Sequence, residues 1–229
     1  EMCIRDRIMV FTFVVFPLIG VAMMPLKAVV GNELYLGILF CTLVPSTVQS
    51  SVAFTSIARG HVAASIVAAS VSSLLGVLFT PLLVLLLMSS SEGFHIDATT
   101  FLDIGVQLLL PFAIGQLLRR WVFKFAASKA TKKVDQISIG LVVYVSFSEG
   151  IVSGVWSSVN WLTILGLVLG SIALVHLMLG VTSVTSRKLG FDYADQVAIQ
   201  FAGTKKSLAS GLPMAAVMFG GASLGMMIL

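Results

Sequence analysis

Charged residues are scarce in this chain of 229 residues, since only 10% are Asp, Glu, Lys or Arg and 58% are hydrophobic. A soluble domain carries about 25% charged and 45–50% apolar residues. Cysteine is also rare, because Cys3 and Cys41 are the only two, and this excludes a disulfide-stapled secreted fold. The apolar excess excludes intrinsic disorder. The class that remains is an integral membrane protein.

Signatures of common enzymes are missing as well. The sequence contains no H-E-x-x-H, G-x-S-x-G, P-loop or C-x-x-C pattern. The aspartates beyond the first seven residues lie at the ends of apolar stretches or in loops, so they offer no deep carboxylate pair for a membrane-embedded protease. We therefore expect a protein that is not an enzyme and that uses no organic cofactor.

Seven apolar stretches are long enough to cross the hydrocarbon layer as helices, which takes about 20 residues each. They do not alternate apolar and polar residues as the strands of a membrane barrel do. The predicted fold is an all-α polytopic bundle within the bilayer. The expected spans are about 8–30, 34–57, 61–89, 103–123, 136–155, 159–186 and 194–218.

The two ends of the sequence differ from the spans between them. Residues 1–7 form a charged tail without the order of a signal peptide, and we expect them to be foreign to the membrane-spanning domain at 8–229. Residues 222–229 are typical of the start of a further span. We therefore expect a fragment of a longer membrane protein.

Basic residues collect in the segment 119–135, whereas the segment 90–103 carries only acidic charges. Because Lys and Arg are enriched in cytoplasmic loops, the loop 119–135 is predicted to be cytoplasmic and the protein to be multi-pass in the inner (plasma) membrane. The same basic cluster could contact nucleic acid, but membrane topology already accounts for it. We expect lipid and no nucleic acid as partners, and we leave self-association open.

Small residues in two spans predict close contacts between helix backbones. The span 61–89 is rich in Ala, Ser and Gly, and Gly166 and Gly170 form a G-x-x-x-G pair. Small side chains of this kind let neighbouring membrane helices approach closely. We expect packing faces there rather than binding sites.

Two spans are interrupted by proline and polar residues. Proline removes a helical hydrogen bond, and in lipid the freed groups need protein or a water-lined cavity as partners. Two such interruptions, one early and one late, point to the substrate site of an inverted-repeat transporter, whereas a single proline kink would be ordinary. The first surrounds Pro45 and contains Ser46, Thr47, Gln49, Ser50 and Ser51; the second runs from Gly203 to Pro213 and contains Thr204, Lys205 and Lys206.

Lys205 and Lys206 lie near the middle of the last predicted span, where each lysine costs at least about 2.5–3.5 kcal/mol to insert. If the span is helical there, the neighbouring side chains point about 100° apart and need not share a partner. Glu149 is the only carboxylate well inside a span, and it is one candidate partner. Alternatively, the lysines face a water-filled site and bind an anion or replace a cation. A third interpretation places them in a cytoplasmic loop. Gln200 lies close enough to line the same site.

Several segments together resemble the bile acid:sodium symporter family, in its divergent bacterial branch akin to the seventh member of solute carrier family ten. They include Val44 to Gly60, Leu108 to Phe112, Val143 to Glu149 and Gly203 to Ala209. The resemblance implies ten helices in two inverted repeats, with crossed and unwound fourth and ninth helices. This chain would then supply helices three to nine. The resemblance places Ser46, Thr47, Gln49, Ser50 and Ser51 at the first crossover, and Gln200, Thr204, Lys205 and Lys206 at the second.

One departure from that family affects the predicted mechanism. The sodium-coupled members carry an acidic residue followed by an amide in the second crossover, whereas the corresponding stretch of this chain has Gln200 and then Lys205 and Lys206. A sodium ion at the crossover is the one metal that the resemblance implies, but an ammonium can take the place of a bound cation. We expect a secondary active transporter of a small organic anion, driven by sodium or protons through alternating access. The alternative is a non-transporting membrane regulator of the same fold.

Overall fold

The computed structural model describes residues 2–88, 128–152 and 160–227, together with 106, 110–111, 113–122, 125 and 154. The named helices of this part are α1 (Met2–Val10), the π-helix η1 (Phe11–Val15), α2 (Phe16–Ala22), the 3-10 helix η2 (Met24–Leu26), α3 (Lys27–Val30), α4 (Asn32–Leu43), α5 (Val48–Ile57), α6 (Val62–Met88), α8 (Lys129–Val152), α10 (Trp161–Lys188), α11 (Tyr193–Thr204) and α12 (Leu208–Met227). The all-α class predicted from composition is confirmed.

Helices of bilayer-spanning length account for four of the predicted spans. The helices α6, α8 and α10 contain 27, 24 and 28 residues and are apolar enough to cross a membrane. Their lengths are roughly 36–42 Å at 1.5 Å per residue. A fourth span is the pair Ile4–Ala22 and Met24–Val30, which bends by 42°. The predicted span 103–123 is described in part, and its residues 113–122 are helical.

Residues near both ends of the described chain belong to regular helices. Residues 2–7 form the first turns of α1, and Ile4 is buried in the core beside Ile8. The charged tail is thus structurally part of the first helix. At the other end, α12 continues without a break to Met227, so residues 222–227 extend the last helix. Residues 228–229 lie outside the described residues.

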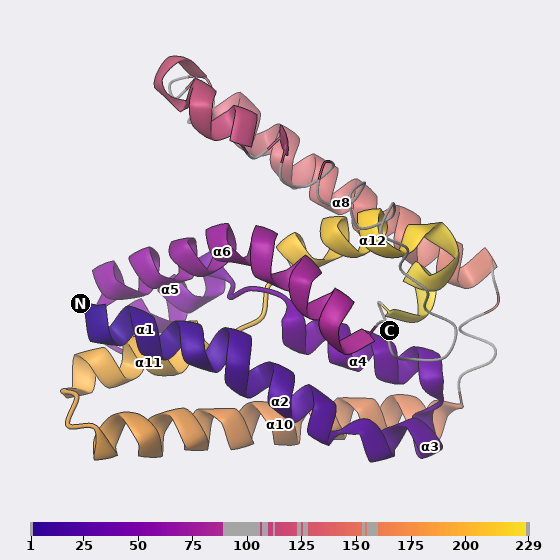
Figure 1. Ribbon diagram of the computed structural model, residues 1–229, viewed down its shortest axis with the longest axis horizontal. Helices are drawn as coiled ribbons and strands as arrows, with labels where there is room; N and C mark the ends of the chain where they lie inside the picture. Colours follow the sequence, from indigo (N-terminus) through magenta and orange to yellow (C-terminus); the bar gives the residue numbers. More distant parts are fainter. Residues whose placement is uncertain are drawn as a thin grey trace.

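The two interrupted spans are each divided into two helices, as their proline and polar residues predict. One chain segment leaves the helical conformation between α4 and α5, and the other does so between α11 and α12. The two breaks cross near the centre of the molecule, with α5 and α11 on one side and α4 and α12 on the other (Figure 1). Crossed discontinuous helices are therefore confirmed.

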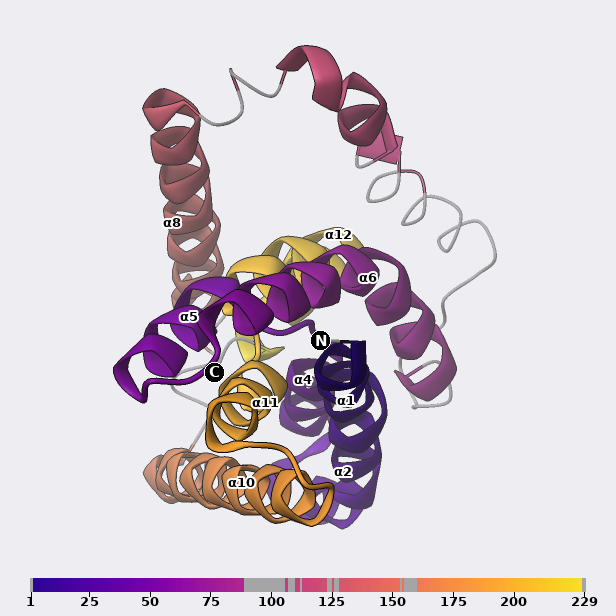
Figure 2. The ribbon, with the colours of Figure 1, turned by 90° about the vertical axis from the view of Figure 1, so that its left-hand side faces the viewer.

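Two apolar cores lie on either side of this crossing. One joins α4 and the first half of α12 to the end of α6, through residues such as Leu43, Val84 and Met214. The other joins α1, α2, α10 and α11 to the start of α6, through residues such as Ile8 and Ala68. Viewed end-on, α11 lies between α10 on one side and α5 with α6 on the other (Figure 2). The helix α6 therefore spans both cores and passes the crossing between them.

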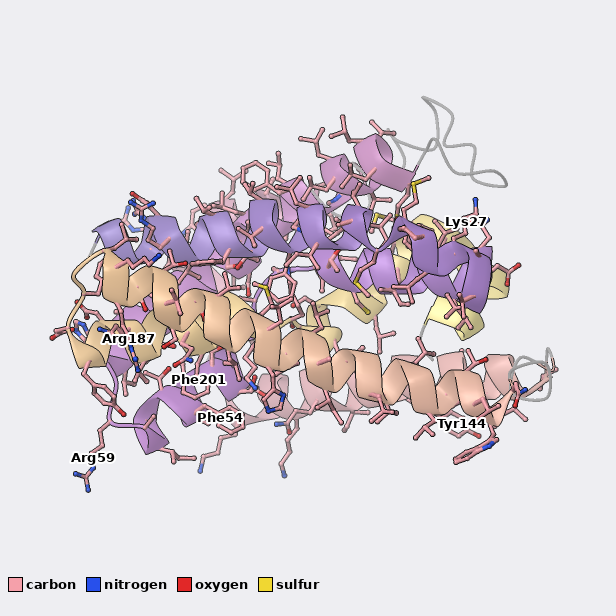
Figure 3. All side chains as sticks on the ribbon, turned by 90° about the horizontal axis from the view of Figure 1, so that it is seen from below. Lys27, Phe54, Arg59, Tyr144, Arg187 and Phe201 are labelled. Atoms are coloured by element: carbon pink, nitrogen blue, oxygen red, sulfur yellow. The ribbon has the colours of Figure 1, made fainter. Side chains whose placement is uncertain are left out.

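The two ends of the bundle carry different residues. Arg59 and Arg187 lie at one end, and Lys27 and Tyr144 lie at the other (Figure 3). We call these the Arg59 end and the Lys27 end. This arrangement agrees with the alternation of spans, which places the turns containing Arg59 and Arg187 on the same side of the membrane.

Candidate functional site at the helix crossing

A short antiparallel pairing holds the two breaks together. The Thr47 amide donates to the Lys205 carbonyl at 3.2 Å, and the Ser207 amide donates to the Pro45 carbonyl at 2.9 Å. The Thr47 hydroxyl adds a bond of 2.7 Å to the Lys206 carbonyl. Both segments have extended backbone angles here, so neither can satisfy its own polar groups. Each break therefore supplies the hydrogen-bond partners that the other lacks within the membrane.

A stripe of small residues on α6 supports the first break. The Ser72 hydroxyl accepts from the Ser46 amide at 3.0 Å, and the Thr80 hydroxyl donates at 2.9 Å to the last carbonyl of α4. Between them, a Cβ atom added to Gly76 would lie 2.6 Å from the Cβ of Pro45. These three positions recur every four residues and so share one face of α6. The close packing predicted for this span is confirmed, and its partner is the break itself.

The Lys206 ammonium lies in a cage of backbone carbonyls. Its Nζ donates to the carbonyls of Thr12, Thr42 and Val44 at 2.9, 2.8 and 2.9 Å. The ring of Phe16 closes the cage, with its centroid 4.5 Å from Nζ. An ammonium group has three N–H donors. All three are therefore used by protein oxygens, and a cation–π contact adds to them.

The carbonyl of Thr12 is free for Lys206 because of the local helix geometry. The Phe16 amide bonds to the Phe11 carbonyl, five residues earlier, which is the π-helical register. In that register the next donor would be the amide of Pro17 and its acceptor the Thr12 carbonyl. Proline has no N–H, so this carbonyl is left without a helical partner and turns to the lysine.

The other two carbonyls belong to the end of α4. In a continuous helix the Thr42 carbonyl would accept from the Ser46 amide, but that amide bonds to α6 instead. Val44 is already extended, with φ −72° and ψ 155°, so its carbonyl leaves the helical ladder. Both carbonyls lie at the C-terminus of α4, which is the negative end of the helix dipole and favours a cation. The proline-containing break therefore creates the acceptors that Lys206 uses.

Lys205 does not join this cage, and its ammonium lies against two aromatic rings. Its Nζ lies 4.5 Å from the ring centroid of Phe54 and 6.0 Å from that of Phe201. The two rings stack at 5.5 Å between centroids and are seen side by side in Figure 3. The expectation of a 100° separation is wrong here, because Lys205 is extended and successive side chains of an extended segment point to opposite faces.

The two lysines differ in how well their charge is compensated. Among the residues that the structure describes, the Lys205 ammonium has no hydrogen-bond acceptor and no ion-pair partner. A cation–π contact contributes about 0.5–2 kcal/mol, less than the cost of about 2.5–3.5 kcal/mol for a lysine in the membrane. Three hydrogen bonds from a charged donor, at about 1.5–3 kcal/mol each, exceed that cost for Lys206. Of the two lysines, Lys206 is the one whose donors are satisfied by the residues that the structure describes.

The polar residues of the first break fall into two groups, those that hold the crossing together and those whose side chains make no hydrogen bond within the described chain. The hydroxyls of Ser46 and Ser51 are buried and donate to carbonyls of α11, so they join the two broken helices. Gln49 is exposed and Ser50 is half-buried, and neither makes a hydrogen bond within the described part of the chain. The predicted set therefore contains three residues that hold the crossing, Ser46, Thr47 and Ser51, and two, Gln49 and Ser50, whose side chains are available to a ligand.

The remaining predicted residues lie on α11 and α8. The Gln200 amide donates to the Leu179 carbonyl of α10 at 3.0 Å, and the Thr204 hydroxyl donates to the Gln200 carbonyl at 2.6 Å. Gln200 thus joins α11 to α10 instead of facing the carbonyl cage. Glu149 belongs to α8, but its side chain lies outside the described residues, so its contact with a lysine stays a prediction.

A cavity of about 400 Å³ opens beside the crossing. Its polar part includes Cys41, Thr42, Thr204 and both lysines, and the rest is lined mainly by apolar side chains of α4 and α10. A second cavity of about 330 Å³ shares Leu167 and Leu174 with it and extends toward the Lys27 end. Such mainly apolar pockets with a few convergent polar groups are typical of small-molecule sites.

Two glycines beside this second cavity do not pack as predicted. Gly166 and Gly170 line the cavity, and a Cβ added to either would meet no atom within 4 Å among those described. The interpretation of this pair as a packing face is therefore wrong within the described chain. The glycines leave space instead of bringing two helices together.

The oxygens at the crossing are already engaged in hydrogen bonds. The three cage carbonyls are bonded to Lys206, and the hydroxyls of Ser46, Thr47 and Ser51 are donors to carbonyls. Within the described ranges, no group of three His, Cys, Asp or Glu side chains could hold a metal ion. The donor set suits an ammonium, which brings its own hydrogens to the same oxygens.

Comparison with known proteins identifies the family. The model of the SBF-like CPA transporter family matches residues 5–229. The chain belongs to this family. It is 49% identical to "Uncharacterized protein PA2026" of Pseudomonas aeruginosa, over 98% of the chain and 69% of that protein. It is 44% identical to "Putative symporter YfeH" of Escherichia coli, over 97% of the chain and 68% of that protein.

A more distant relative carries a name that mentions a substrate. "Sodium/bile acid cotransporter 7" of Xenopus tropicalis is 30% identical over 93% of the chain and 64% of that protein. The chain thus spans about two thirds of the length of these relatives. The resemblance to the divergent branch of the symporter family is confirmed, and the protein is a membrane transporter by family.

Several residues of the site were not predicted from the sequence. Thr12 and Phe16 complete the Lys206 cage, and Phe54 and Phe201 hold Lys205. Pro17 offered a signal for the first pair, because a proline inside an apolar span frees a carbonyl. The aromatic pair gave no such signal, since phenylalanine is common in membrane helices and the contact joins two distant segments.

Proposed function

We propose that the protein is a secondary active transporter of a small organic anion, and that a built-in ammonium replaces the coupling sodium ion. The observation that carries this proposal is the pair of lysines at the crossing of two broken helices, beside a cavity of about 400 Å³. A positive site with apolar walls favours an anion over a neutral or cationic ligand. Transport would proceed by alternating access around the crossing.

The Lys206 cage supports proton coupling in place of sodium coupling. A charged lysine supplies three N–H groups to three carbonyls, whereas a neutral amine has only two N–H groups. Loss of one proton therefore leaves a carbonyl of the cage unpaired and weakens the link between α12, α4 and η1. In this way the protonation state of one side chain is linked to the geometry of the crossing.

The experiment is uptake of taurocholate into proteoliposomes containing the purified protein. Taurocholate is the first probe because a relative's name includes bile acid. We expect saturable uptake when choline replaces sodium, and loss of uptake in Lys205→Ala and Lys206→Ala. A strict sodium requirement that persists in both variants would refute the built-in cation.

The same assay separates the carrier from a regulator of the same fold. A non-transporting membrane protein would show no saturable uptake of any organic anion, even where it binds one. Thermal stabilisation by taurocholate that disappears in Gln49→Ala or Lys205→Ala would show an occupied site at the crossing. Uptake that does not saturate would instead indicate a channel.

A further inference from the structure

The two neighbouring lysines have separate surroundings. Lys206 is enclosed by three carbonyls and one ring, on the side of the crossing that faces α4 and η1. Lys205 borders the same cavity of about 400 Å³ as Lys206, but its ammonium lies against rings supplied by α5 and α11. Its N–H donors have no protein acceptor among the residues that the structure describes. An anion can therefore bond to Lys205 without displacing any existing contact.

The rings beneath Lys205 hold the ammonium in place while leaving its donors available. Phe54 and Phe201 stack with an angle of 22° between their planes, and Phe54 remains 43% exposed. A ring face attracts a cation but does not accept three directed hydrogen bonds as carbonyls do. The aromatic pair thus fixes the position of the charge and presents an apolar surface beside it.

A second polar group lies on the same face of α5. Ser50 precedes Phe54 by four residues, so the two side chains lie one turn apart on one face of the helix. The Ser50 hydroxyl is half-buried and has no hydrogen bond within the described chain. It belongs to the first turn of α5, whose N-terminus lies at the crossing and favours negative charge. The Lys205 ammonium, the Ser50 hydroxyl and the N-terminus of α5 all favour an anionic group.

We propose that Lys205, together with Phe54, Phe201 and Ser50, binds the anionic head of the ligand, and that Lys206 does not contact it. The ligand is a transported substrate only if the proposed function holds, and the inference rests on that function to this extent. Binding of the anion to Lys205 can be tested without transport. The ligand class is a carboxylate or sulfonate attached directly to a flat apolar body, which would lie against the exposed part of Phe54. Lys206 acts through its carbonyl cage on the geometry of the crossing instead of binding the ligand.

The test uses benzoate and benzamide, which share a ring and differ in charge. Binding of each is measured by calorimetry to the purified protein in phosphatidylcholine nanodiscs, where anionic lipid headgroups are absent. We expect the wild-type protein to bind benzoate at least about tenfold more tightly than benzamide, a difference of about 1.4 kcal/mol. The Lys205→Gln variant should lose this preference, and Lys205→Arg should keep most of it.

Lys206→Gln is the matched control, because it changes the adjacent residue in the same way. It should retain the preference for benzoate, although its thermal stability falls. A preference for benzoate that survives in Lys205→Gln would overturn the assignment, and so would equal wild-type binding of the two probes. Failure of uptake with an intact, Lys205-dependent preference would reject the transport function while supporting this site.

Discussion

Replacing Lys206 by methionine tests the carbonyl cage directly. The change keeps an unbranched side chain that is one atom shorter, and it removes the three N–H donors. Three buried carbonyls then lack a donor, at about 1–3 kcal/mol each, while the insertion cost of the ammonium, about 2.5–3.5 kcal/mol, is no longer present. We expect a net loss of about 3 kcal/mol in the free energy of unfolding.

The measurement is thermal unfolding of the purified protein in detergent. For a chain of this size, a loss of about 3 kcal/mol lowers Tm by about 6–12 °C. Lys205→Met is the matched control, and it should leave Tm unchanged or raise it, because that ammonium has no acceptor among the described residues. Equal losses in both variants, or an unchanged Tm in Lys206→Met, would contradict the contrast drawn between the two lysines.

A smaller side chain allows the cage to be refilled from solution. In Lys206→Ala the space of the side chain is vacated, while the carbonyls of Thr12, Thr42 and Val44 keep their positions at the end of α4 and in η1. We expect ammonium chloride to raise Tm of this variant in a saturable way, and to leave the wild-type protein unchanged. An equal response to tetramethylammonium, which has no N–H donor, would contradict this expectation.

Two further predictions concern the surroundings of the crossing. Gly76→Ala should lower Tm by several degrees, because the added Cβ would lie 2.6 Å from the Cβ of Pro45. Gly166→Ala is the control and should leave Tm unchanged, because no described atom lies within 4 Å of its added Cβ. Similar Tm values for the two variants would refute the close contact at Gly76. Cys41 lines the cavity, so a maleimide should label it in a Cys3→Ser background and abolish uptake in proteoliposomes. Full labelling with unchanged uptake would show that this cavity is not on the transport path.

The breaks themselves could be predicted from sequence, because few arrangements other than an interrupted helix account for proline and polar residues inside an apolar span. Pro45 and the cluster around Lys205 marked the two places where the backbone needs partners other than its own helix. The inference that both belong to one site followed from the known architecture of inverted repeats. The structure confirms the crossing and adds the pairing of Ser46 with Lys206.

The directions of the side chains could not be predicted in the same way. The sequence was compatible with a helix through Lys205 and Lys206, and only the extended backbone separates their environments. The Lys206 cage depends on a π-helical register at Phe11–Val15, which no residue type specifies by itself. The aromatic pair Phe54 and Phe201 depends on how two half-helices meet, and that is decided by packing across the whole molecule.

In the extended connection between α11 and α12, the number of residues matters as much as their identity. In such a segment a shift of one residue turns every side chain to the opposite face. Inserting a single residue between Thr204 and Lys205 would exchange the surroundings of the two ammonium groups without altering either lysine. Substitution scans cannot reveal this dependence, whereas a series of single-residue length variants would show an alternating, odd-and-even pattern of function.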